Sequence, residues 1–127
     1  MRFKKLKVWQ SACRLSCDIY KTMRTCNDYG FKDQITRSGL SIPSNIAEGE
    51  ERESVKDQLR FLNIAKSSTA ELITQIYIGI EIGYIEKTAG LSWINDTETI
   101  AASIGRLSKT KQTRVNEDPA DYMHLDN

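Results

Sequence analysis

Hydrophobic residues recur along most of the chain at spacings of three and four, the period of an α-helix that buries one face. This pattern predicts four helices, at about residues 6–25, 32–49, 54–82 and 88–111. The first and last carry the apolar stripes Val8, Ala12, Leu15, Ile19 and Met23, and Leu91, Ile94, Ala101, Ile104 and Leu107. Between the first two helices, Asn27, Asp28 and Gly30 predict a turn.

The second predicted helix contains a proline. Its residues Ile35, Ile42 and Ile46 are seven and four positions apart, so they share one helical face. Pro43 cannot donate a hydrogen bond to the carbonyl of Gly39, and the chain can bend at a glycine with little steric cost. The segment is therefore predicted to be a kinked helix, or two short helices, that ends at Gly49.

Polar residues of this segment suit structural roles. Asn45 is expected to bond to backbone that the bend exposes. Glu48 is expected to anchor the following turn, through either Arg52 or Arg60. We interpret these residues as architecture rather than as catalytic groups.

The third predicted helix begins at a capping-box pattern, Ser54 followed by Asp57. It carries two apolar seams instead of one, which indicates a helix that packs on both sides. The first seam consists of Val55, Leu59, Leu62, Thr69, Ile73, Ile76 and Ile80, with Lys66 as a charged interruption. The second seam is rich in small residues and consists of Phe61, Ala65, Ser68, Leu72, Gly79 and Ile82. Its first five residues are the candidate contact with a neighbouring subunit.

Four helices with short connections predict an all-α fold, an up-down-up-down four-helix bundle with a Pro-kinked second helix. The bundle is assigned to residues 1–111. Residues 112–127 lose the apolar period and gain acids and a proline, so they are predicted to be a disordered C-terminal tail. A chain of 127 residues, 39% hydrophobic and 28% charged, suits one small helical domain.

The sequence offers little for catalysis. Its one histidine, His124, lies in the predicted tail, and it contains no glycine-rich phosphate loop or metal-ligand spacing. Cys13, Cys17 and Cys26 form no CxxC pair and are typical of buried thiols in a reducing compartment. No apolar run reaches the ~18–20 residues of a membrane helix. We therefore expect a cytoplasmic protein that is not an enzyme, with no catalytic residue, cofactor, metal or membrane contact.

Basic residues cluster before the first helix and at the end of the fourth, which meet at one end of an up-down-up-down bundle. The helix dipole explains some of the late cations but not the early ones. The candidates for nucleic-acid binding are Arg2, Lys4, Lys5, Lys7, Arg106, Lys109, Lys111 and Arg114. Two alternatives to nucleic-acid binding stay open. These basic residues are either ordinary solvent-exposed charges, or they form ion pairs with acids of the same or a neighbouring subunit. Those acids are Glu48, Glu50, Glu51 and Glu53.

Residues 41–49, Ser-Ile-Pro-Ser-Asn-Ile-Ala-Glu-Gly, resemble the signature of the four-helix bundle family associated with 23S rRNA intervening sequences. The resemblance covers roughly residues 3–110. The family-motif positions, interpreted as structural, are Ser41, Ile42, Pro43, Asn45, Ile46, Ala47, Glu48, Gly49 and Glu71. In one departure from the family pattern, Glu50 and Glu51 precede Arg52 where an aromatic residue and a glycine are common, which makes this end less basic.

The resemblance implies a four-helix bundle that assembles into a ring-shaped homopentamer. Some relatives are encoded within rRNA insertions, and others are accessory proteins of diversity-generating retroelements that bind a reverse transcriptase and nucleic acid. Two hypotheses follow. The chain is either an RNA- or DNA-binding oligomer that uses its basic end, or a scaffold that binds a partner protein such as a reverse transcriptase.

Overall fold

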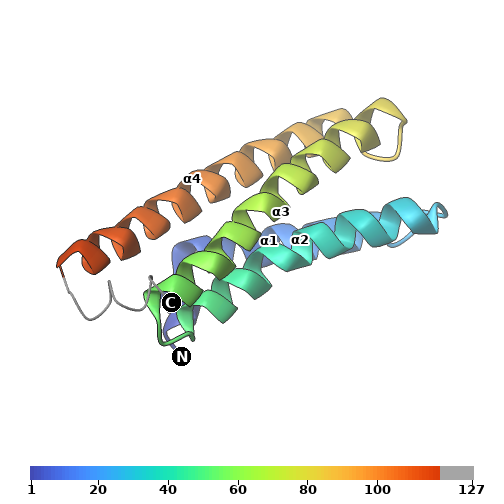
Figure 1. Ribbon diagram of the computed structural model, residues 1–127. Helices are drawn as coiled ribbons and strands as arrows, with labels where there is room; N and C mark the ends of the chain where they lie inside the picture. The colour runs from blue at the N-terminus through green and yellow to red at the C-terminus, as the bar shows by residue number, and fades with distance from the viewer. Residues whose placement is uncertain (118–127) are drawn as a thin grey trace.

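The computed structural model describes the backbone of residues 1–117 and the side chains of residues 1–114. Within these residues a short 3-10 helix precedes four α-helices: η1 (Arg2–Lys5), α1 (Lys7–Met23), α2 (Tyr29–Glu50), α3 (Val55–Glu81) and α4 (Lys87–Glu117). Contacts join α1 with α2, α2 with α3, α3 with α4 and α4 with α1. Successive helices run in opposite directions (Figure 1). The predicted all-α four-helix bundle is confirmed.

The core is built mainly from the predicted apolar stripes. All four helices contribute fully buried side chains, among them Ala12, Leu15, Ile19, Met23, Ile35, Ile42, Ile46, Leu62, Leu72, Ile76, Ile94 and Ile104. Leu91 departs from its predicted role, because it is 45% exposed near the start of α4. The apolar stripes of the four helices are buried against one another, and this burial holds the bundle together.

Helix α2 is unbroken from Tyr29 to Glu50, with Pro43 inside it. The alternative of two short helices is therefore wrong, whereas a kink at Pro43 stays a prediction. The helix also begins three residues earlier than expected. Asp28 caps it by accepting a hydrogen bond from the backbone N–H of Phe31 at 3.1 Å, so the predicted turn is shorter.

Two further expectations for α2 need correction. Asn45 donates to the carbonyl of Ser41 at 2.8 Å, and not to the carbonyl that Pro43 leaves free. Gly49 does not end the helix, and its φ is not positive. A Cβ at Gly49 would lie 3.2 Å from the carbonyl oxygen of Gln58 and 3.3 Å from Cβ of Phe61. Glycine is needed there because α2 and α3 approach closely.

Most residues of both α3 seams are buried or half-buried within one chain, where α3 contacts α2 and α4. Ile82 departs from the prediction, because it is 50% exposed just after the helix. On the second seam, the hydroxyl oxygen of Ser68 lies 2.9 Å from that of Ser41 on α2, and Ala65 and Leu72 are fully buried. A Cβ at Gly79 would lie 2.5 Å from Cδ1 of Ile85. Ala65, Ser68, Leu72 and Gly79 are therefore unavailable to a neighbouring subunit. These residues pack inside the bundle instead, and this corrects the sequence-based assignment.

Helix α4 continues to Glu117, so residues 112–117 are helical and not part of a disordered tail. At the predicted end of the helix, Lys111 is 4% exposed and forms an ion pair with Glu50 at the end of α2. The rest of the predicted tail, residues 118–127, lies outside the described residues.

Side-chain caps fix the starts of α3 and α4. The hydroxyl of Ser54 accepts from the backbone N–H of Asp57 at 3.2 Å, which confirms the predicted cap. The carboxylate of Glu86 accepts from the backbone N–H groups of Ala89 and Thr88 at 2.8 and 3.1 Å. These bonds favour the charged form and lower the pKa of Glu86 below its ordinary value of 4.5.

Candidate nucleic-acid interface

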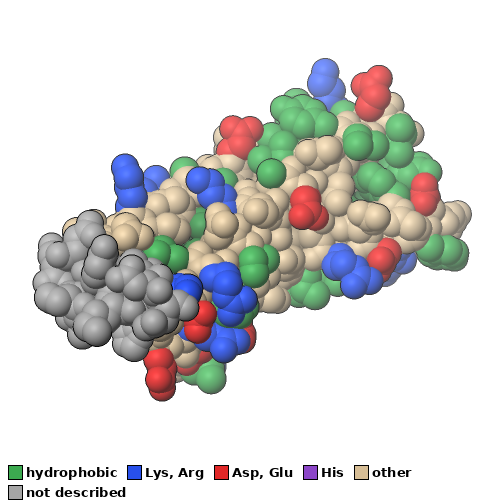
Figure 2. Space-filling model, in the orientation of Figure 1, with side chains coloured by type: hydrophobic (Ala, Val, Ile, Leu, Met, Phe, Trp, Pro, Cys, Tyr) green, Lys and Arg blue, Asp and Glu red, His purple; other side chains and the backbone are tan. Residues whose placement is uncertain are grey.

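The N-terminus and the C-terminal half of α4 lie at the same end of the bundle, as predicted (Figure 1). The cations of η1 (Arg2–Lys5) are exposed there. The side-chain amide of Gln10 donates to the carbonyl of Lys4 at 2.8 Å, and the ring centres of Phe3 and Trp9 are 5.2 Å apart, edge to face. These contacts hold η1 against the bundle. Figure 2 shows Lys and Arg side chains, with some acids among them, near this end.

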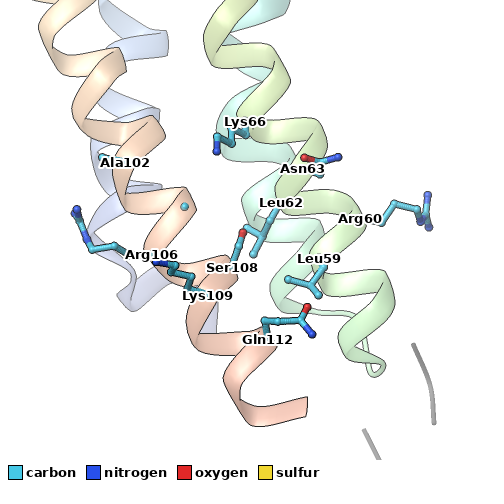
Figure 3. Close-up of a pocket in the computed structure, with 11 residues that line it drawn as sticks. Leu59, Arg60, Leu62, Asn63, Lys66, Ala102, Arg106, Ser108, Lys109 and Gln112 are labelled. Atoms are coloured by element: carbon cyan, nitrogen blue, oxygen red, sulfur yellow. The ribbon is translucent and has the colours of Figure 1, made fainter. Parts of the chain in front are cut away.

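An open groove of about 800 Å³ lies between α3 and α4 toward this end (Figure 3). It is lined by apolar residues, chiefly Leu59, Leu62 and Ala102, and by four cations. Lys66 lies between the two helices, whereas Arg60 and Arg106 extend outward from opposite walls (Figure 3). The fourth cation is Lys109 on α4.

The groove exists because α4 presents small residues to it. Ala102 and Gly105 occupy positions where larger side chains would fill the space, and a Cβ at Gly105 would meet nothing within 4 Å. Arg106 and Lys109 lie four and seven residues after Ala102, so they share its helical face. The same sequence pattern therefore opens the groove and makes it cationic.

Nearby acids do not cancel the charge of the groove lining. Glu48 forms an ion pair with Arg52, which is one of the two partners predicted for it. Asp57 lies 3.6 Å from Arg60, an exposed pair that salt screens readily. Among the side chains of residues 1–114, Lys66 and Lys109 have no ion-pair partner, and none of the groove's lining residues is acidic. The lining is therefore electropositive.

Phe61, predicted as a subunit contact, is half-buried beside this groove. The guanidinium groups of Arg52 and Arg60 lie 4.6 and 4.5 Å from its ring centre. Such cation–π contacts restrain long arginine side chains that would otherwise be mobile. They present two oriented cations near the end of α2.

Lys111 corrects the list of predicted cations. Its Nζ lies 2.8 Å from Oε1 of Glu50, and the two side chains are 5% and 10% exposed. The contact is an ion pair without hydrogen-bond geometry at Oε1. Lys111 is therefore not available to nucleic acid. Glu50, one of the acids expected to pair with the basic end, does so within its own subunit.

The structure brings together only part of the predicted basic surface. Arg106 and Lys109 line the groove, and Arg114 is exposed one turn beyond it. Lys7 instead lines a separate hollow between α1 and α4. The η1 cations Arg2, Lys4 and Lys5 belong to an element that contacts α1 and α2 but not α4.

Sequence reasoning missed two groove residues, Arg60 and Lys66. A signal for Lys66 was present, because it is the charged interruption in an otherwise apolar seam of α3. Placing it opposite Arg106 and Lys109 requires the pairing of α3 with the end of α4, which the sequence pattern does not specify.

The structural role of the family-motif residues stays a prediction, and their burial differs from one to the next. Ile42, Pro43 and Ile46 are buried in the α2 face, and Ala47 is half-buried. Glu71 is exposed and lines a shallow hollow between α2 and α3 together with Ser41. None of them lies in the groove.

No group of three or more His, Cys, Asp or Glu residues is placed to hold a metal ion in the part of the chain that is described. The pKa of the Cys13 thiol is raised, mainly by burial and to a smaller extent by the neighbouring Cys17. Within residues 1–117, no helix has the length and apolar character needed to cross a membrane. His124 lies outside the described residues.

Comparison with known proteins identifies the family. The model of the 23S rRNA-intervening sequence protein family matches residues 4–106. The chain belongs to this family. Its fold is similar to the crystal structure of a protein of unknown function from the S23 ribosomal protein family of Bacteroides thetaiotaomicron, with a TM-score of 0.75 and 28% identity over 80% of this chain and 98% of that one. No curated protein matches. The resemblance seen in residues 41–49 is thus confirmed at the level of the family.

Proposed function

We propose that this member of the 23S rRNA-intervening sequence protein family binds RNA, without catalysing a reaction, through the groove between α3 and α4. The observation that carries the proposal is a lining with four cations and no acid among its described residues. The exposed cations of η1 lie at the same end of the bundle, on the side of α1 and α2. Phosphate contacts position a chain without reading its bases, so we expect little sequence preference and action in the cytoplasm, where RNA is abundant.

Salt dependence of RNA binding tests this proposal. If the four groove cations, Lys4 and Lys5 engage about six phosphates of single-stranded RNA, log affinity should fall with log salt at a slope of about −4. Fluorescence anisotropy with a labelled RNA measures the slope. Replacing Lys66, Arg106 and Lys109 with Glu should weaken binding at least about tenfold at low salt.

The matched control reverses three exposed cations at the other end of the bundle, Lys21, Arg24 and Lys87. It changes the net charge by the same amount, so any general charge effect appears in both variants. Far-ultraviolet circular dichroism shows whether both remain helical. Binding that ignores salt, or an equal loss in the two variants, would exclude the groove as the RNA site.

A second candidate function is supported by exposed apolar side chains on α2 and α3. The side chains that are between 40% and 54% exposed include Leu40, Ile64, Tyr77 and Ile78. Because they are exposed in one chain, they are free to contact another subunit. We propose on this ground that the chain forms a homo-oligomer, a pentamer in the form that the family resemblance implies. Under this second hypothesis the oligomer is a scaffold that binds a partner protein such as a reverse transcriptase.

Light scattering tests the assembly. The expected mass is five times the 14.5 kDa of one chain, and replacing Ile64 and Leu40 with Glu should lower it without loss of helix content. A 14.5 kDa particle at micromolar concentration would exclude both the ring and the scaffold. A scaffold would also retain its protein partner when the groove cations are reversed, whereas an RNA-dependent complex would not.

A further inference from the structure

The groove between α3 and α4 has more apolar surface than a phosphate backbone requires. The half-buried Leu59 of α3 and the exposed Ala102 of α4 offer apolar surface there together with the cations, and the fully buried Leu62 lies beneath them. Phosphates are bound by charge and hydrogen bonds and gain nothing from leucine side chains. An occupant that carries both acids and apolar side chains would match this lining better.

The sequence after Glu117 has this composition. Residues 118–127 contain three acids, Asp118, Asp121 and Asp126, and no Lys or Arg. They also contain Tyr122, Met123 and Leu125 between the acids. We propose that residues 118–127 of the same chain dock in the groove, with their acids against its cations and their apolar side chains against Leu59 and Ala102, and that they compete there with RNA. The competition rests on the proposed function, whereas the docking does not.

The length of the segment permits this docking. Along α4, the groove extends from Gln112 back to Ala102, about 15 Å, and Glu117 lies about 7.5 Å beyond Gln112. Ten residues span up to about 33 Å when extended. The segment reaches the whole groove without any change in the bundle.

Amine labelling of the full chain tests the docking without RNA. A lysine-reactive reagent followed by mass spectrometry gives the labelling rate of each lysine. In the parent protein, Lys66 and Lys109 should react at least about threefold more slowly than Lys56, which is exposed and outside the groove. Replacing Asp118, Asp121 and Asp126 with Asn should abolish this protection.

Two further variants show what causes the protection. Replacing Tyr122, Met123 and Leu125 with Ala keeps the acids and should also abolish it, because Leu59 and Ala102 of the groove lose their apolar partners. Replacing the exposed acids Glu51, Glu53 and Glu81 with Gln removes the same charge elsewhere and should leave it intact. Protection should not change on tenfold dilution. Protection that is lost on dilution would assign the segment to a neighbouring copy and overturn docking within one chain.

RNA binding then tests the competition. If the segment occupies the groove in most molecules, only the remaining molecules can bind RNA, and the apparent affinity for RNA falls in proportion. The variant with Asn at positions 118, 121 and 126 should therefore bind RNA about threefold more tightly than the parent, which is the factor expected for lysine protection. The Glu-to-Gln control corrects for the general change in charge. Salt-dependent RNA binding with no protection of Lys66 and Lys109 overturns the docking and leaves the proposed function standing. Protection without RNA binding by any variant supports the docking and overturns the proposed function.

Discussion

Replacing Lys111 with Met is expected to lower the free energy of unfolding by about 3–5 kcal/mol. The substitution keeps the length and apolar stem of the side chain but removes its charge. Glu50, whose side chain is 10% exposed, would then carry a buried charge whose ion-pair partner at 2.8 Å is gone. Desolvation of an unpaired carboxylate costs several kcal/mol, more than the pair itself contributes. Urea denaturation followed by circular dichroism measures the change.

Two controls separate this effect from a loss of packing. Lys109→Met removes an exposed lysine two residues away and should change the unfolding free energy by less than about 0.5 kcal/mol. The double variant Glu50→Gln with Lys111→Met removes both charges and should recover much of the loss. A loss that is equally large in the double variant would mean that packing, and not charge, is responsible.

The sequence predicted the bundle well because the relevant information is local. The three-and-four spacing of apolar residues gave all four helices, and the Ser54 cap is where it was expected. The errors concern partners that lie far apart along the chain. Lys111 is predicted to be a free cation, yet it is buried against Glu50 of α2. The end of α4 is predicted at residue 111 because residues 112–117 lack an apolar stripe, yet the helix continues to Glu117.

The same reason explains what was missed at the candidate site. Cations are visible in a sequence, but burial decides which of them can meet a ligand. Lys111 and Lys109 differ by two positions, and only the approach of α2 makes one buried and leaves the other exposed. Likewise, the groove depends on the absence of side-chain volume at Ala102 and Gly105, opposite α3. The small residues on α3 indicated that another helix packs closely against them. They did not indicate that this helix is α2 of the same chain.

Leu72→Ala is expected to lower the free energy of unfolding by about 2–5 kcal/mol, because it removes a fully buried side chain and leaves a cavity between α2 and α3. The matched control is Ile78→Ala on the same helix, where the side chain is 49% exposed and the expected loss is below about 1 kcal/mol. The pair also tests the corrected role of the second α3 seam. Burial within one chain predicts a loss measured by urea denaturation, with the particle mass in native buffer unchanged. If Leu72 met a neighbouring subunit instead, light scattering would show a smaller particle while the helix content stayed the same, and that result would contradict the packing of α3 against α2.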